Sequence, residues 1–271
     1  MITNKNIVVF DIQTSCEDKN INPYYNIEII KIHAIKIANR EIVDSFETFI
    51  KPEYTDKLTD YCIKLTGITF DDLETAPKFT VAILEFYKFI YGCEIYSCGE
   101  FDKRLLVNEL NEKGYREEHE LTRNFIEASY TNLKSYYNKI TGNKKVGVVD
   151  MANALEVKLT GDHYKATSDA ETLGKIFLAI EEIRANRLSE TFDSKTMFKL
   201  IDGLNKNHNR ISVIKDEKSY YLLNLKSGTF IKFDLVGLLD TLKDLIMIDI
   251  EIKGLSYIDI QALNTLKKYG K

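Results

Sequence analysis

The stretch Ile7-Val8-Val9-Phe10-Asp11-Ile12-Gln13-Thr14 decides which fold this chain can adopt. Ile7–Phe10 is a short apolar run of the kind that forms a buried strand. Asp11 comes directly after this run, and the neutral Gln13 follows two residues later. An acid at the end of a buried strand is well placed to bind a metal ion. The pair therefore indicates a metal site in which one acidic ligand has been replaced.

The patterns around this stretch predict a mixed α/β domain. Further strands are expected at 27–38 and 41–50, joined by a tight turn at Asn39-Arg40, so that the first three strands form an antiparallel meander. Two more strands are predicted at 94–98 and 125–128, helices at 59–65, 76–91, 101–113, 133–141, 148–155 and 169–187, and a turn at 70–73. The helix at 76–91 has apolar residues on every side, which is typical of a buried helix. This order of elements is that of a mixed α/β fold.

Residues 188–271 are predicted to form a separate α+β domain, so the expected domains are 1–187 and 188–271. A meander is expected at 210–215, 220–225 and 229–233, with helices at 194–205, 235–245 and 257–269. Tyr220 and Tyr221 look exposed, and the helices carry Leu and Ile on more than one face. These apolar positions predict a homodimer contact or a docking surface for a protein partner. The alternative is a small domain that completes the core of its neighbour.

Composition and charge narrow the classes of protein to consider. No apolar run approaches the roughly 20 residues of a membrane helix, and the N-terminus lacks a signal-peptide profile, so we expect no membrane association and a cytoplasmic location. The net charge of −4 argues against a broad surface that grips phosphates. The four cysteines form no CxxC pair and are expected to be reduced, mostly buried thiols rather than zinc ligands; they are Cys16, Cys62, Cys93 and Cys98.

Three acids stand where strands and helices meet. Asp11 ends the first strand, Asp102 opens a helix after the fourth strand, and Asp169 opens the long helix at 169–187. Hard divalent cations bind several carboxylate oxygens that converge at about 2.0–2.6 Å. Acids at the ends of elements can converge in this way without burying an unpaired charge. For each acid taken alone, a helix cap or a solvated carboxylate is the alternative.

Several segments, taken in order, resemble the 3′-to-5′ exonucleases of the DEDD superfamily (DEDDh type), in the Eri-like branch that also holds the bacterial KapD-type proteins. The segments include Val-Val-Phe-Asp-Ile-Gln-Thr-Ser-Cys (8–16), Glu-Ile-Ile-Lys-Ile-His-Ala-Ile (28–35), Phe-Glu-Thr-Phe-Ile-Lys-Pro-Glu (46–53) and Leu-Thr-Asp-Tyr-Cys-Ile-Lys-Leu-Thr-Gly-Ile-Thr (58–69), with further matches at 76–77, 98–102, 132–134 and 161–170. The resemblance covers about residues 5–185. It implies a ribonuclease H-like fold, in which a mixed five-stranded sheet is flanked by helices.

The resemblance also implies a ligand set. Members of the family hold two Mg²⁺ or Mn²⁺ ions about 3.5–4 Å apart. Four acids bind these ions, the first two in a strand-borne Asp-x-Glu, and a His five residues before the last Asp is the general base. By position, Asp11, Asp102 and Asp169 match the metal ligands. Gln13 replaces the Glu, and Tyr164 replaces the His.

Each departure from the family has a chemical consequence. Gln13 offers one neutral carbonyl oxygen, and a lost unit charge is worth about 4 kcal/mol at 4 Å with an effective dielectric of about 20. The Tyr164 phenol, with an ordinary pKa near 10, is a poor base at neutral pH, and loss of a general base typically lowers the rate by about 10²–10⁴. Lys31 and His33 also depart, because the family usually has Glu and Gly there.

Two histidines offer alternatives that would restore the chemistry. His163 directly precedes Tyr164, and a shift of one residue in this loop would bring its imidazole inward. His33 could supply a nitrogen ligand or a base. The competing interpretations are a solvated loop residue for His163 and, for His33, a packed strand side chain or a plug in the emptied metal site.

The resemblance implies substrate contacts as well. It places residues 65–69 beside the 3′-terminal nucleotide and Thr14 beside its sugar, and Phe101 could stack on a base. The predicted substrate-binding residues are therefore Thr14, Leu65, Thr66 and Phe101. The alternatives are that Leu65, Ile68 and Phe101 belong to the core and that Gly67 ends a helix.

Three functions remain open on the sequence. The first is a pseudo-exonuclease that has lost or strongly reduced two-metal hydrolysis, binds Mg²⁺ or Mn²⁺ weakly if at all, and retains a regulatory role or the binding of a single-stranded RNA or DNA 3′ end. The second is an active 3′-to-5′ exonuclease on single-stranded RNA or DNA with a variant metal site. The third is a protein-interaction module in which residues 188–271 do the work.

Overall fold

The structure is a computed structural model of the whole chain. It describes residues 6–16, 27–113, 120, 123, 125, 130–144, 147–159, 166–191, 202, 211–216, 219–224, 230–233 and 237–238. The chain divides into two compact units, one of residues Lys5–Ile180 and one of Met1–Asn4 with Glu181–Lys271. The domain boundary expected between 187 and 188 stays a prediction. Within the described residues, no helix has both the length and the apolar composition needed to cross a membrane.

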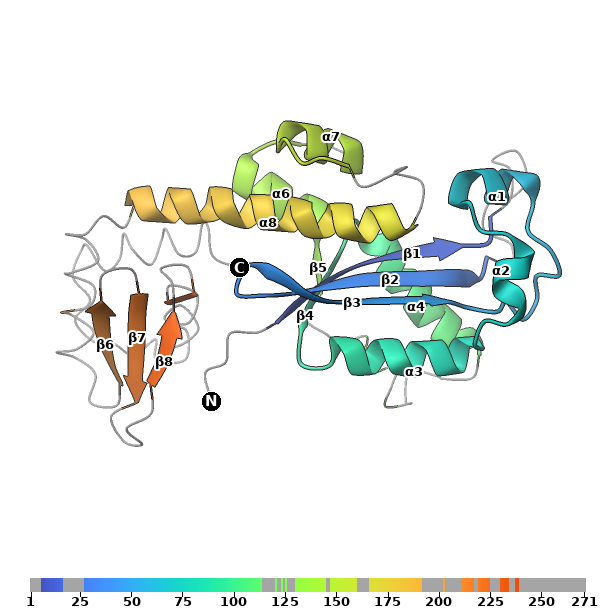
Figure 1. The fold of residues 1–271 in the computed structure, drawn as a ribbon, viewed down its shortest axis with the longest axis horizontal. Coiled ribbons are helices and arrows are strands. Elements are labelled where there is room, and N and C mark those ends of the chain that lie inside the picture. The colour runs from blue at the N-terminus through green and yellow to red at the C-terminus, as the bar shows by residue number, and fades with distance from the viewer. Residues whose placement is uncertain are drawn as a thin grey trace. The chain divides into compact units, whose positions relative to one another are not determined.

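A mixed five-stranded sheet forms the centre of the larger unit, which confirms the predicted ribonuclease H-like α/β fold (Figure 1). Its strands are β1 (Ile7–Thr14), β2 (Ile29–Ala38), β3 (Glu41–Phe49), β4 (Glu94–Ser97) and β5 (Tyr130–Asn132), in the spatial order β3-β2-β1-β4-β5. The first three strands are antiparallel, whereas β4 is parallel to β1 and β5 is parallel to β4. Asn39 and Arg40, with φ of 51° and 65°, make the predicted tight turn between β2 and β3.

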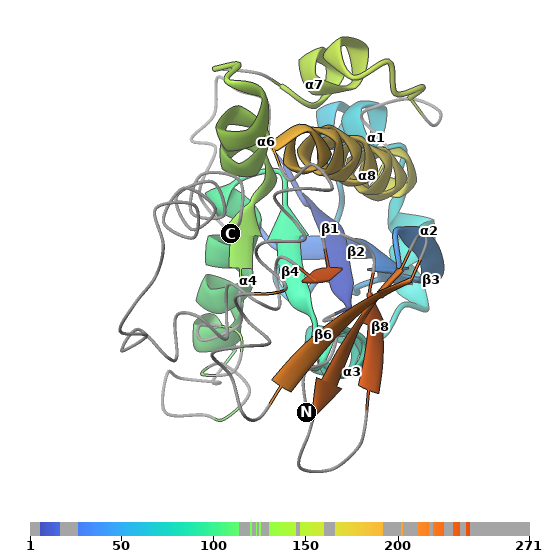
Figure 2. The same ribbon diagram turned by 90° about the vertical axis from the view of Figure 1, so that its left-hand side faces the viewer.

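Helices cover both faces of this sheet (Figures 1 and 2). The helices are α1 (Asp60–Thr66), α2 (Phe70–Glu74), α3 (Phe79–Ile90), α4 (Glu100–Glu112), α6 (Leu133–Thr141), α7 (Val148–Ala154) and α8 (Ala166–Thr191). On one face, α3 and α4 pack against alternate residues of β1, among them Val8 and Phe10. On the other face, Tyr96 of β4 packs edge-on against Phe177 of α8, with ring centroids 4.8 Å apart. The sheet is thus the middle layer of three.

Four sequence predictions in this unit were wrong. Asp11 lies within β1, which continues to Thr14, rather than at the end of the first strand. The fifth strand is β5 rather than 125–128, because Phe125 is helical and packs its ring against Phe86 in the core. Residues 70–73 form the short helix α2 rather than a turn. Only one face of α3 is buried, and Val81 and Leu84 on its outer side are exposed. Apolar residues all round a helix therefore did not mean burial all round, because a single sheet covers only one side.

The smaller unit contains the predicted meander. Its strands are β6 (Ile211–Asp216), β7 (Ser219–Asn224) and β8 (Phe230–Phe233), and both pairings are antiparallel. Tyr220 is buried, which contradicts its expected exposure and weakens the case for a contact there. The helices predicted at 194–205, 235–245 and 257–269 lie outside the described residues, apart from helical residues at 202 and 237–238. A homodimer or partner contact through residues 188–271 stays a prediction.

The cysteines match the sequence analysis in part. All four are free thiols, as expected. Only Cys62 is buried, whereas Cys16, Cys93 and Cys98 are half-buried. The prediction of mostly buried thiols was therefore wrong for three of them.

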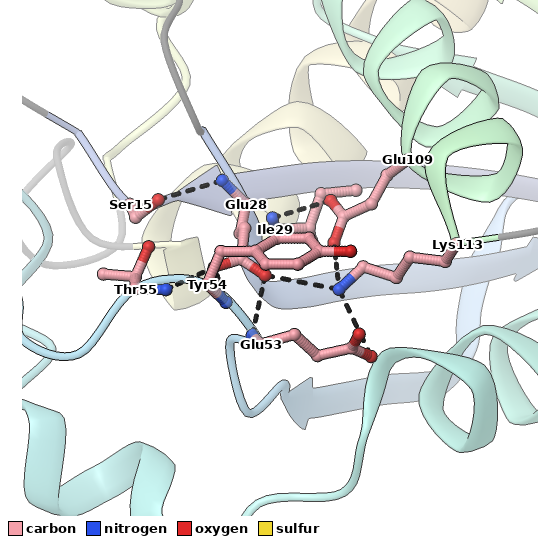
Figure 3. A network of polar contacts seen from close by, with 8 residues as sticks. All are labelled: Ser15, Glu28, Ile29, Glu53, Tyr54, Thr55, Glu109 and Lys113. Atoms are coloured by element: carbon pink, nitrogen blue, oxygen red, sulfur yellow. Dashed lines mark hydrogen bonds and ion pairs between the residues drawn. The ribbon is translucent and has the colours of Figure 1, made fainter.

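A buried ionic network ties the start of β2 to the end of α4 (Figure 3). The Glu28 carboxylate accepts hydrogen bonds from the backbone N–H groups of residues 53, 54 and 55 at 2.7–3.0 Å. Lys113, only 3% exposed, lies 3.2 Å from Glu28 and 3.5 Å from Glu109. Glu109 also accepts a hydrogen bond of 2.8 Å from the backbone N–H of Ile29. Burial raises the pKa of Glu109 to about 7, against the opposing effects of that N–H group and of Lys113.

Lys113→Met should destabilise the protein, because it leaves buried carboxylates without their cation. We expect a loss of about 3 kcal/mol in the free energy of unfolding near pH 8. The pKa of Glu109 lies above its ordinary 4.5, so stability already falls as the pH rises from about 4.5 to about 7. Without Lys113, the free energy of unfolding should fall more steeply over this pH range. The difference between the variant and the unmodified protein should therefore be smaller near pH 5.5 than near pH 8. Urea unfolding at the two pH values measures both effects.

Lys88→Met is the matched control. Lys88 pairs with Glu85 at 2.7 Å, also within one helix, but both side chains are well exposed. Its removal should change the free energy of unfolding by about 0.5 kcal/mol or less at either pH. Equal losses for the two variants would show that Lys113 does not stabilise buried charge.

Candidate functional site

The register of β1, β2 and β3 gathers the polar residues of the sheet on one face. Asp11 lies directly opposite His33 of β2, which in turn lies opposite Glu47 of β3. Gln13 lies directly opposite Lys31 in the next row. Because residues paired across strands share a face, all five side chains stand on the same side of the sheet. This is the face that α8 covers, since the backbone of α8 at Gly174 approaches Ile35, two residues beyond His33 on β2.

Burial varies along these rows. Asp11 is half-buried, whereas the side chains of Gln13 and His33 are buried. The Lys31 side chain is 7% exposed, and its ammonium lies 2.5 Å from the Glu47 carboxylate and 4.6 Å from the centre of the Phe49 ring. A lysine is seldom buried unless it is paired. The Glu47 carboxylate provides that pairing here.

Asp102 reaches the site from α4, in the first turn after β4. It is 8% exposed. Burial raises the pKa of its carboxyl to about 6, while a hydrogen bond with Ser97 and the charge of Lys134 oppose this rise. The N-cap residue of α4 is Gly99, so Asp102 is not the N-cap. The helix-cap alternative therefore does not account for this acid.

The Cys98 thiol lies near three charged groups, those of Asp11, Asp102 and Lys134. Burial raises the pKa of its thiol to about 11; the negative charges of Asp102 and Asp11 raise it further, and Lys134 lowers it. Lys134, in the first turn of α6, also makes a hydrogen bond with this thiol. The Asp11 and Asp102 carboxylates thus both act on one half-buried thiol, with an ammonium beside them. Such a thiol is protonated at neutral pH and is a poor nucleophile.

The residues predicted to bind substrate have different surroundings. Thr14 ends β1, and its carbonyl accepts a hydrogen bond of 3.5 Å from the Cys62 thiol of α1. Leu65 is half-buried, and Thr66 is buried with its hydroxyl donating to the Cys62 carbonyl at 2.8 Å. Phe101 is 41% exposed, with the Arg104 guanidinium 5.8 Å from the centre of its ring. The core alternative is therefore wrong for Phe101.

The structural alternatives for residues 65–69 are correct at two positions: Gly67 ends a helix, and Ile68 belongs to the core. Gly67, with φ of 71°, ends α1, and its N–H donates to the Ile63 carbonyl at 2.7 Å. Ile68 belongs to a small buried apolar cluster. These two residues build the local structure, and Leu65 is the residue of this segment with an apolar side chain partly open to solvent.

The last part of the predicted site lies largely outside the described residues. His163 and Tyr164 belong to this undescribed part, so their roles stay predictions. Asp169 has a described backbone in the first turn of α8, but its side chain is not described. The predicted helix at 169–187 is confirmed and extends over 166–191.

Sequence reasoning did not single out three residues of this site. Glu47, Cys98 and Lys134 lie in segments that carry the family resemblance, but no role at the site was predicted for any of them. Alternation along β3 could have placed Glu47 on a defined face, but only the register with β2 shows that this face also carries Lys31. For Lys134, a basic residue in the first turn of a helix was the available signal, because cations are unfavourable there.

The described donors do not fit a pair of divalent cations. Among the described side chains, no three or more His, Cys, Asp and Glu residues are placed to hold a metal ion. The carboxylates of Asp11 and Asp102 both act on Cys98, and the residue two positions after Asp11 on β1 is the neutral Gln13. Lys134 lies beside Asp102, and Lys31 lies on the face of Asp11. Hard dications need several anionic oxygens, and ammonium groups oppose them.

Comparison with known sequences links this arrangement to nucleases. The sequence family described as exonuclease matches residues 8–177. A DNA polymerase III of the PolC type from Caldanaerobacter subterraneus subsp. tengcongensis is 31% identical over 194 residues, which cover 68% of this chain and 12% of the polymerase. Human 3′-5′ exoribonuclease 1 is 36% identical over 75 residues, which cover 27% of this chain and 21% of that enzyme. The chain therefore matches only a small part of the length of these relatives.

Comparison with solved structures gives the same fold. The nuclease domain of 3′hExo, a DEDDh family member solved with bound rAMP, superposes with a TM-score of 0.58 and 20% sequence identity. The match covers 66% of this chain and 92% of that domain. At this level of identity the similarity concerns the fold alone.

Asp102→Asn should stabilise the protein. The pKa of Asp102 lies above its ordinary 3.8, so the folded state loses stability as the pH rises from about 3.8 to about 6. An amide cannot ionise and avoids this loss. We expect a gain of about 2–3 kcal/mol in the free energy of unfolding near pH 7 and a much smaller gain near pH 4.5. Denaturant unfolding at both pH values measures the gain.

The control is Asp71→Asn, at an exposed acid that is also in the first turn of a helix. Its effect should stay within about 0.5 kcal/mol at both pH values. If Asp102→Asn destabilises the protein near pH 7, the carboxylate is better compensated than its surroundings indicate.

Proposed function

The chain belongs to the DEDD-superfamily exonucleases, and on that basis we propose that it is a pseudo-exonuclease that binds the 3′ end of single-stranded RNA or DNA. In this proposal the family's two-metal hydrolysis is lost or strongly reduced. The protein keeps the exonuclease fold and is related to 3′-5′ exonucleases.

The observation that carries the proposal is the buried Gln13 on the strand of Asp11, directly opposite Lys31. An amide contributes one neutral oxygen, where a carboxylate contributes two that share a negative charge. Position 13 therefore adds no negative charge to the face that carries Asp11. The Tyr164 phenol in the place of the general base acts in the same direction, because it keeps its proton at neutral pH.

Retained binding is supported by an exposed aromatic beside the site. Phe101 adjoins Asp102 on α4, and base stacking on an aromatic ring is worth about 1–3 kcal/mol for any base. Thr14 and Leu65 are the proposed contacts to the terminal nucleotide, because the Cys62 hydrogen bond to Thr14 holds α1 against the end of β1. Thr66 has a structural part in this proposal, since its hydroxyl already bonds within α1.

Fluorescence polarisation with 5′-labelled single-stranded oligonucleotides tests the binding. The protein should bind short RNA or DNA in EDTA, and a circular oligonucleotide of the same sequence, which has no 3′ end, should compete poorly. Phe101→Ala should weaken binding about tenfold through lost stacking. Tyr91→Ala removes a well-exposed aromatic at the end of α3 and should leave the affinity unchanged.

The same oligonucleotides test the loss of hydrolysis on denaturing gels. With millimolar Mg²⁺ or Mn²⁺, the unmodified protein should leave their length unchanged. Shortening at the speed of an ordinary nuclease would instead support an active enzyme with a variant site, for which His33 directly opposite Asp11 is the favourable observation. Absence of any binding, with or without metal, would support a protein-interaction module.

A further inference from the structure

We infer that the Lys31 ammonium supplies a positive charge on this face of the sheet. This charge keeps divalent metal ions away from Asp11 even when an acid is restored at position 13. The inference rests on the proposed function and deepens it, because it names a second residue that determines which ligands the site accepts. Gln13 alone would explain a weakened metal site. With Lys31 as well, the face of the sheet not only loses a negative charge at position 13 but also gains a positive charge at position 31.

The strand register places Lys31 where it can act on position 13. The two residues are direct partners in the antiparallel pair of β1 and β2. Such partners have Cβ atoms about 4.5–5.5 Å apart and on the same face. A lysine carries its ammonium on a flexible four-carbon stem, which reaches across this spacing. A carboxylate at position 13 would therefore lie within reach of the Lys31 ammonium.

The Lys31 side chain has two close partners on β3. The side chain is 7% exposed, its ammonium lies 2.5 Å from the Glu47 carboxylate, and the ring of Phe49 lies below it. The Glu47 side chain is 40% exposed, so water also reaches that carboxylate. The charge of Lys31 also acts on the exposed carboxylate of Asp72 in α2. An ammonium has three donors, so Lys31 is still able to bind a further carboxylate at position 13.

Ammonium groups already neutralise most of the described negative charge on this face. The described side chains around the site include three acids and two lysines: Asp11, Glu47, Asp102, Lys31 and Lys134. A dication next to Asp11 would share the face with a buried ammonium, and like charges repel most strongly where water is excluded. An added carboxylate at position 13 would pair with Lys31 before it could serve as a metal ligand.

Binding of Mn²⁺ to the full-length protein without nucleic acid tests this inference. Calorimetry and Mn²⁺ paramagnetic resonance should be applied to Gln13→Glu, to Lys31→Met and to the double variant. Gln13→Glu alone should bind Mn²⁺ no more than about threefold more tightly than the unmodified protein, because Lys31 takes up the new charge. The double variant should bind at least about tenfold more tightly than Gln13→Glu.

Thermal unfolding in EDTA gives a second readout. Gln13→Glu should retain most of its stability, because Lys31 compensates the new carboxylate. The double variant should melt at a lower temperature in EDTA and recover when Mn²⁺ is added. Should Lys31→Met fail to fold, Lys31→Gln removes the same charge with a polar side chain and replaces it in every arm.

Lys36→Met in the Gln13→Glu background is the matched control. Lys36 stands on the same strand but on the opposite face, where its ammonium lies 4.1 Å from the centre of the Phe89 ring. This variant should bind Mn²⁺ like Gln13→Glu. Equal tight binding by Gln13→Glu and by the Gln13→Glu/Lys31→Met variant, or a gain with Lys36→Met, overturns the inference. The proposed function is judged separately, on the unmodified protein and oligonucleotides.

Discussion

The antiparallel pairing of β1 with β2 is the constraint on which the rest of this structure depends. It places Phe10 and Ile12 opposite Ala34 and Ile32 on the face that packs against α3 and α4. The same register places Asp11 opposite His33 and Gln13 opposite Lys31 on the other face. A slip of one residue would turn the apolar set to the charged side and the charged set into the core, so the core and the site fix each other.

Buried charge serves two different purposes in this molecule. Around Glu28 and Lys113, the carboxylate and ammonium groups have close hydrogen-bond and ion-pair partners, and the network joins the start of β2 to α4. Around Asp102, burial outweighs its partners and raises the pKa of the carboxyl to about 6. Burial also raises the pKa of Glu109 to about 7 in the first network, so what distinguishes Asp102 is that it acts, together with Asp11, on the Cys98 thiol. In the proposed function, Asp102 is a ligand position of the family that is kept, whereas Gln13 and Lys31 change the charge around Asp11.

Much of the fold followed from the sequence because the local signals were strong. The turn at Asn39-Arg40 and the helices at 133–141 and 148–155 were predicted close to their observed bounds, and the strand predicted at Ile7–Phe10 is the first half of β1. Where the signal was ambiguous, tertiary packing decided. Phe125 lies in a short apolar run that suits a strand or a helix, and its helical state goes with its contact to Phe86. Tyr220 looked exposed in a polar meander and is buried.

The sequence by itself determined the chemical groups: an acid on the first strand, an amide where the family has a second acid, and a lysine and a histidine on the next strand. It determined these because side-chain chemistry is local. The tertiary structure decided which groups share a face, since the register of β1, β2 and β3 brings Gln13, Lys31 and Glu47 together across 34 residues of chain. It also decided the state of Asp102, because burial is a property of the packed molecule and shifts a pKa that no sequence pattern reveals.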